Sequence, residues 1–322
     1  AQNPPGFTYE DFDFAVTQPN ASGECAPATP VRVFRSFRAA VNGRTSNHRY
    51  TTSVASYDGM TAAGWAPEQA AFCVTSATDA ALVPGSSFKR LVSLPATPFA
   101  AGCGAQSSGT LYRGAEVEPH LAVNPRNSNH MVAAWQQDRW SNGAAQGLAG
   151  AVSFDGGRNW QNTLAAFSRC SGGTPASGTN YDRSSDPWVS IGADGTAYQM
   201  ALGVSGASFT GSAISAMLVA RSTDGGFTWS APQTLVRDAS ADIFHDKNTI
   251  KADPFVASNV YAIWGRLEAD GHGPAWFTRS TDRGATWEPS RGVYDPGPVN
   301  QTLGNGLDVL PNGTLINVFL EI

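Results

Sequence analysis

Three copies of one eight-residue pattern constrain the fold of this chain more than any other feature. Each copy reads S-x-D-x-G-x-x-W, and the copies begin at Ser153, Ser222 and Ser280, which are 69 and 58 residues apart. A pattern that returns at such a period indicates a fold built from repeated units. Each copy lies between apolar, extended-looking stretches, so we expect it to form a hairpin turn. The fixed residues are Ser153, Asp155, Gly157, Trp160, Ser222, Asp224, Gly226, Trp229, Ser280, Asp282, Gly284 and Trp287.

This pattern resembles the Asp-box, or BNR, repeat of sialidase-type β-propellers. In that family the repeat lies away from the active face and stabilises its blade, so the resemblance implies a structural role for these residues. It also implies an all-β fold, a β-propeller of sialidase type with six blades in the complete ring. Three blades and the start of a fourth are visible here, so we expect further sequence beyond this chain.

Alignment of the three copies places equivalent residues at the start of each predicted blade. Glu118, Asp186 and Lys247 precede the serines of their copies by 35, 36 and 33 residues. A fourth blade is predicted around Asn312-Gly313, a strong hairpin signal, and its equivalent residue is Gly304. Because the innermost strand of a propeller blade starts at the central channel, we expect these positions to meet there.

The channel entrance is predicted to contain the functional site. Residues two positions apart on a strand point to one face, so His120 and Trp188 accompany Glu118 and Asp186. Two carboxylates, a cation, an imidazole and an indole around one funnel suit a polar sugar. The alternative is that Glu118-Pro and Asp186-Pro end loops and bind backbone amides. The candidate catalytic residues are Asp186 and Glu118, and the candidate substrate-binding residues are Lys247, His120, Arg183, Tyr181 and Trp188.

The resemblance implies a secreted propeller of the sialidase superfamily that acts on or binds glycans. Sialidases clamp the substrate carboxylate with three arginines, and the first of these lies in a motif like F/Y-R-I-P. That motif does not occur in this sequence. Two interpretations therefore stay open: a glycoside hydrolase, or a non-catalytic propeller that serves as a cell-surface or extracellular interaction or structural protein.

The N-terminal part of the chain has a different pattern. We predict a small α+β accessory module over residues 1–84, followed by the propeller over residues 85–322. The segments that begin at Val31, His48, Ala63 and Ala71 are similar to a short repeat found in secreted bacterial proteins. The resemblance implies two strands, a helix and a segment that contains Gly-Trp. A sugar-binding accessory and a structural cap both fit this module.

Charge and composition narrow the expected partners. The net charge is −5, and the sequence has no basic cluster, which argues against nucleic acid and anionic membranes. No apolar run approaches the roughly 18 residues that span a bilayer. We expect a glycan or an extracellular protein as partner. No cofactor is expected; Ca²⁺ at Asp182 and Asp186 stays open, although the D-x-D-x-D-G pattern of a calcium loop is absent.

Four cysteines predict two disulfides and a secreted, extracellular or cell-surface protein. We expect Cys25 to pair with Cys73, and Cys103 with Cys170, although three connectivities and free buried thiols all remain open. The chain opens with Ala-Gln-Asn-Pro-Pro, which is typical of a mature protein whose signal peptide has been removed.

Overall fold

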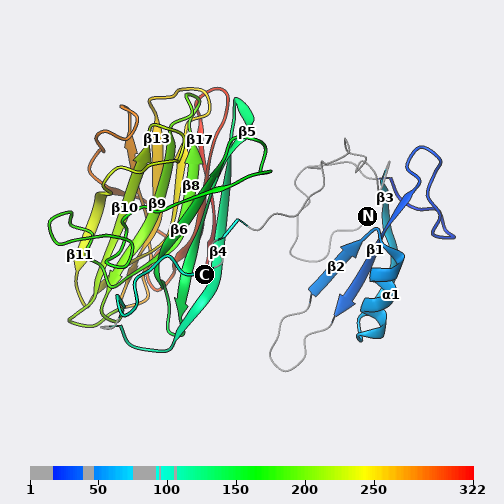
Figure 1. The fold of residues 1–322 in the computed structure, drawn as a ribbon, viewed down its shortest axis with the longest axis horizontal. Coiled ribbons are helices and arrows are strands. Elements are labelled where there is room, and N and C mark those ends of the chain that lie inside the picture. The colour runs from blue at the N-terminus through cyan, green and yellow to red at the C-terminus, as the bar shows by residue number, and fades with distance from the viewer. Residues whose placement is uncertain (1–16, 39–46, 75–91, 94–95, 105–106) are drawn as a thin grey trace. The chain divides into compact units, whose positions relative to one another are not determined.

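Two compact units make up the chain in the computed structural model, Ala1–Lys89 and Arg90–Ile322 (Figure 1). The structure describes residues 17–38, 47–74, 92–93, 96–104 and 107–322. The predicted module boundary between residues 84 and 85 lies outside the described residues.

The first unit is a small α+β module. Its three strands form an antiparallel sheet in the order β2-β1-β3. Ser53 caps the helix, because its side chain accepts a hydrogen bond from the Ser56 amide at 3.2 Å. Tyr57 of the helix stacks on Phe34 of the sheet with ring centroids 4.7 Å apart. The elements are β1 (Val31–Arg38), β2 (Asn47–Thr51), α1 (Val54–Ala62) and β3 (Ala66–Val74).

The second unit is all-β and consists of the successive blades of a β-propeller. Three blades have four antiparallel strands each, and a fourth has two. A single bridge between Ala145 and Ser184 joins the first two blades into one eight-stranded sheet. The first blade contains β4 (Leu111–Asn124), β5 (Asn127–Trp140), β6 (Ala145–Ser153) and β7 (Gln161–Thr163). The second contains β8 (Arg183–Ile191), β9 (Ala197–Ser205), β10 (Ile214–Ser222) and β11 (Gln233–Ala239). The third contains β12 (Ile243–Ala252), β13 (Val260–Glu268), β14 (Ala275–Ser280) and β15 (Arg291–Tyr294), and the last sheet pairs β16 (Thr302–Val309) with β17 (Leu315–Glu321).

The blades are joined through their first strands and through apolar side chains between neighbouring sheets. Strand β8 contacts both β4 and β12, and β12 also contacts β16, so the four first strands lie side by side. One core cluster packs Met200 of the second blade against Ile250 and Trp264 of the third. Another packs Val132 of the first blade against Val189 of the second. The core therefore lies between blades, which is why each sheet needs its neighbour.

The three copies of the repeated pattern form three equivalent turns, each between the third and fourth strand of its blade. In each turn the serine hydroxyl accepts the glycine amide, at 2.9, 2.6 and 2.8 Å in chain order. The aspartate accepts the amide four residues later, at 2.9 Å in all three. The glycines of the three turns have positive φ angles of 83, 109 and 74°, which glycine adopts without steric strain. The tryptophans Trp160, Trp229 and Trp287 are partly buried.

The hairpin turns lie where the sequence predicts them, but the first strands begin earlier. Strand β4 begins at Leu111, β8 at Arg183 and β12 at Ile243, which is three to seven residues before the predicted blade starts. Glu118, Asp186 and Lys247 therefore lie inside the first strands rather than at their ends. The site is consequently held by paired backbone on both sides.

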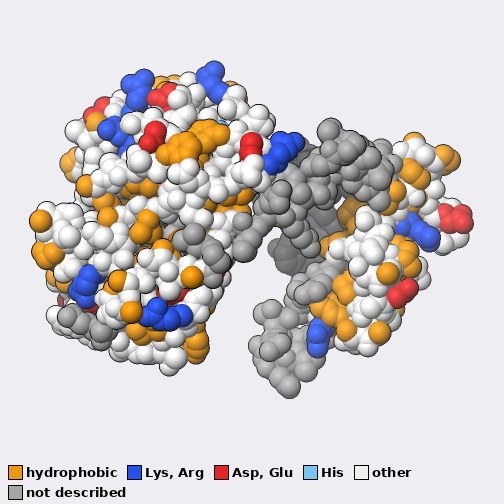
Figure 2. All heavy atoms as spheres, in the orientation of Figure 1, with side chains coloured by type: hydrophobic (Ala, Val, Ile, Leu, Met, Phe, Trp, Pro, Cys, Tyr) orange, Lys and Arg blue, Asp and Glu red, His pale blue; other side chains and the backbone are white. Residues whose placement is uncertain are grey.

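The expected disulfides are confirmed, since Cys25 pairs with Cys73 and Cys103 with Cys170. No helix within the described part of the chain is long and apolar enough to cross a membrane. On the face drawn in Figure 2, the Lys and Arg side chains of the second unit are scattered singly.

Candidate functional site

One unusual backbone conformation recurs in all four first strands. Glu118, Asp186 and Lys247 each have a φ of 51°, and Gly304 has a φ of 68°. The strand pairing shifts register at the same four places. Such a shift marks a β-bulge, which turns the strand and redirects a side chain. A proline follows Glu118 and Asp186, and its missing amide hydrogen suits the interrupted ladder.

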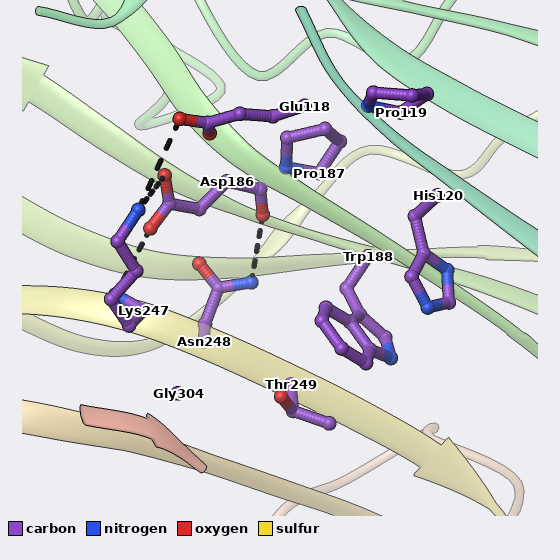
Figure 3. A pocket seen from close by; sticks show the side chains of 10 residues that line it. All are labelled: Glu118, Pro119, His120, Asp186, Pro187, Trp188, Lys247, Asn248, Thr249 and Gly304. Carbon is purple, nitrogen blue, oxygen red and sulfur yellow. Dashed lines mark hydrogen bonds and ion pairs between the residues drawn. The ribbon is translucent and has the colours of Figure 1, made fainter. Parts of the chain in front are cut away.

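The four bulges surround a recess of about 220 Å³ (Figure 3). Its walls come from the first strands of all four blades. The structure thus brings together five of the predicted site residues, together with the prolines and the polar residues that follow them. The lining residues are Glu118, Pro119, His120, Asp186, Pro187, Trp188, Lys247, Asn248, Thr249 and Gly304.

Lys247 links the two predicted catalytic carboxyl groups. Its Nζ lies 3.6 Å from Oδ1 of Asp186 and 4.0 Å from Oε1 of Glu118. Asp186 is nearly buried, with its side chain 7% exposed, whereas the Glu118 side chain is 37% exposed. Glu118 is therefore the carboxyl group that a ligand can reach.

Asp186 also has the backbone role that the alternative interpretation predicts. Its Oδ2 accepts the Lys247 amide at 3.0 Å, and its Oδ1 accepts the Ser185 hydroxyl at 2.7 Å. Its backbone carbonyl accepts the Asn248 side-chain amide at 2.9 Å. Asp186 therefore joins the second blade to the third and, at the same time, faces the Lys247 ammonium.

Burial and mutual repulsion separate the pKa values of the carboxyl groups. Burial raises the pKa of Glu118, and the negative charge of Asp186 raises it further, against the attraction of Lys247. Burial also acts to raise the pKa of Asp186, but the Lys247 charge and hydrogen bonds from neighbouring groups outweigh it, so that pKa is lowered. Burial and the Asp186 charge raise the pKa of Asp246 to about 7. Asp186 is thus the group that holds the negative charge.

An aromatic pair forms the other side of the recess. The His120 ring stacks on Trp188, with centroids 4.0 Å apart and ring planes 28° apart. His120 Nδ1 accepts the Val189 amide at 3.2 Å, which leaves Nε2 as the protonated nitrogen of the neutral ring. Burial lowers the pKa of His120 to about 4, so the imidazole is uncharged at neutral pH. This side of the site is flat, apolar and neutral.

A second layer of polar side chains, which no sequence pattern predicted, lies behind the recess. Gln136 is fully buried on β5, and its amide nitrogen donates to both Glu118 and the Ser185 hydroxyl. Arg139 in turn donates to the Gln136 oxygen. Asp246 and Ser185 directly precede the bulge residues Lys247 and Asp186. Alignment of the blades therefore gave a weak indication that Asp246 and Ser185 lie close to the site.

Two predicted substrate-binding residues lie away from the recess. Tyr181 is buried in a core cluster with Leu148 and Phe167. Arg183 lines an adjoining recess, and its guanidinium donates to the Asn142 side chain and to the carbonyl of Gly143, at 2.8 and 2.7 Å. Among the described residues, no group of three or more His, Cys, Asp and Glu side chains is placed to hold a metal ion.

Comparison with known proteins gives likenesses of fold alone. No protein-family model and no curated protein matches this chain. Among solved structures, the Hadza microbial sialidase Hz136 matches with a TM-score of 0.42 and 21% identity, over 60% of this chain and 40% of that one. The Trypanosoma rangeli sialidase gives 0.44 and 15%, over 64% and 34%. The Penicillium chrysogenum α-L-arabinanase gives 0.44 and 17%, over 64% and 57%, so this chain spans 34–57% of the length of these three structures.

Proposed function

We propose that the second unit is a sialidase-like propeller that binds a glycan in the recess and transfers a proton to it from Glu118. One observation supports this proposal. The recess contains a carboxyl group with a raised pKa, Glu118, and one with a lowered pKa, Asp186, next to the aromatic face of His120 and Trp188. Neighbouring carboxyl groups whose pKa values are pushed apart supply an acid and an ionised partner to one reaction. The repeated turns, which resemble Asp-boxes, and the two disulfides support a secreted protein of this kind.

In this proposal each side chain has a distinct task. Glu118 is the general acid, because it is accessible and its pKa is raised. Asp186 stays ionised and stabilises positive charge on the sugar ring, as the second carboxylate does in glycoside hydrolysis. Lys247 donates to hydroxyl groups, and the Trp188–His120 pair packs against the C–H face of the ring.

A second function, glycan binding without turnover, is favoured by one specific feature. Glu118 and Asp186 share the Lys247 ammonium, at 4.0 and 3.6 Å. Hydrolases with two carboxylates keep them about 5–9.5 Å apart, so that a sugar and water fit between them. A carboxyl pair that is already bridged by a lysine suits a binding site that orients a ligand without breaking it.

A glycosidase assay with paired variants separates these functions. We expect Glu118→Gln to lower kcat on a panel of aryl glycosides by about 100-fold or more, because the amide cannot donate the catalytic proton. Glu116→Gln changes an exposed carboxyl group two residues earlier on β4 and is expected to retain activity.

Melting temperatures of both variants close to that of the unmodified protein would show that the fold is intact. Full turnover by the Glu118 variant would contradict the proposed acid. No turnover by any of the three proteins, with glycan binding retained, would favour the binding propeller.

A further inference from the structure

We infer that the recess accepts an uncharged saccharide, which it recognises through hydroxyl donors, and that it rejects sugars bearing a carboxylate. This inference rests on the proposed function and specifies its class of ligand. Three features of the lining carry it: an unpaired acceptor, a cation that is already paired, and a neutral aromatic face.

The unpaired acceptor is the side-chain oxygen of Asn248. The Asn248 amide nitrogen donates to the backbone carbonyl of Asp186 at 2.9 Å, and a carbonyl can only accept, so the orientation of the amide is fixed (Figure 3). The Asn248 oxygen has no hydrogen-bond partner among the described residues, although the residue is only 2% exposed. Leaving a buried acceptor unpaired costs free energy, which a hydroxyl of a bound ligand would recover.

The recess has open space at its fourth bulge. Gly304 occupies the fourth bulge position, and a Cβ placed there would meet no atom within 4 Å. The equivalent positions in the other blades carry Glu118, Asp186 and Lys247. The recess is therefore unobstructed at its fourth corner.

The charge of the recess opposes an anionic ligand. Lys247 is the one cation among the ten lining residues, and its ammonium is shared between Glu118 and Asp186. Arg139 donates to Gln136, and Arg183 donates to Asn142 and Gly143. Recognition of a carboxylate uses bidentate arginine pairs, and neither guanidinium is presented in that way here.

The aromatic face adds no positive charge. The pKa of His120 is lowered to about 4, so the His120–Trp188 stack is neutral at physiological pH. The carboxylate group of an acidic sugar supplies only acceptors and would meet the Asn248 oxygen, which is an acceptor too, beside the ionised Asp186. A ring hydroxyl supplies a donor to Asn248, and the ring supplies an apolar face to Trp188.

Calorimetric titration of the unmodified protein with matched sugar pairs tests this inference. The pairs are methyl glucoside with methyl glucuronide, methyl galactoside with methyl galacturonide, and lactose with sialyllactose. We expect at least one neutral member to bind, and its acidic partner to bind at least about 10-fold more weakly in low salt. The preference should shrink as salt is raised, because screening weakens the repulsion.

Variants identify the groups responsible. Asp186→Asn removes the ionised partner of Lys247 at nearly constant shape and should narrow the neutral-to-acidic preference, whereas Glu116→Gln, at an exposed position on β4, should leave it unchanged. Asn248→Ala should weaken binding of the neutral sugar by removing the free acceptor.

The outcomes separate the two proposals. An acidic sugar that binds as tightly as its neutral partner, or a preference unaffected by salt, would overturn this inference and leave glycan binding intact. Failure of every sugar in the panel to bind would overturn the proposed function and this inference with it.

Discussion

A carboxyl group that is buried beside a negative charge holds its proton to unusually high pH, and Asp246 is in this position. Its pKa is raised to about 7 by burial and by Asp186. In the unfolded chain an aspartate loses its proton near pH 4. Between these values the folded state holds a proton that the unfolded state has released, so the free energy of unfolding falls as pH rises from about 4 to 7.

Asp246→Asn is therefore expected to flatten that decline. Urea unfolding at pH 5, 6 and 7 should show the unmodified protein losing stability, relative to this variant, as pH increases. Asp242→Asn, an exposed substitution four residues earlier, is the control and should follow the unmodified protein. Titration of His245 also changes the free energy of unfolding in this pH range. Its contribution cancels in the comparison because all three proteins contain His245. Parallel curves for all three proteins would show that Asp246 is ionised throughout.

Individual residues of the site could be predicted only where a local pattern placed them. Glu118, Asp186 and Lys247 follow from the spacing of the repeats. Gln136 does not, because its role depends on Ser185, 49 residues away in the next blade. A partner at such a distance is set by how two sheets pack, and no short sequence pattern records it.

At the scale of elements, the repeated turns carry their own stabilisation. The Ser222 hydroxyl accepts the buried Gly226 amide at 2.6 Å and donates to Asp224 at 2.6 Å. All the groups involved lie within five residues, so the turn could be predicted from sequence. The starts of the first strands could not, because a bulge depends on pairing with the next strand.

Ser222→Ala is expected to destabilise the protein by about 1–3 kcal/mol, because it leaves the Gly226 amide without a partner. Thr223→Ala, in the same turn, changes an exposed side chain and should alter stability by less than about 0.5 kcal/mol. Thermal or urea unfolding of both variants measures the difference. Equal stability of the two variants would mean that the serine contributes nothing to the turn.

At the scale of the whole molecule, one covalent link lies in each unit. Cys25–Cys73 connects the segment before β1 to β3 in the first unit. Cys103–Cys170 connects the segment before β4 to the segment between β7 and β8 in the second. Each closes a long loop and so restricts the unfolded chain.

Intact-mass measurement without reductant should show a mass lower by four hydrogen atoms than the reduced chain, as two disulfides require. Replacing Cys103 and Cys170 together by serine is expected to cost about 2–5 kcal/mol of stability. A protein that retains free thiols after purification under non-reducing conditions would contradict both expectations.

The bulge has the same backbone conformation in all four first strands but a different residue in each, which could be used for engineering. Four strands hold the same left-handed backbone angle, yet they present an acid, a second acid, a base and no side chain at all. The space around Gly304 would admit an added side chain, but its φ of 68° places strain on any other residue at that position. The fourth bulge is thus the position where a new group could be added to the recess without removing one that is already there, at the cost of backbone strain.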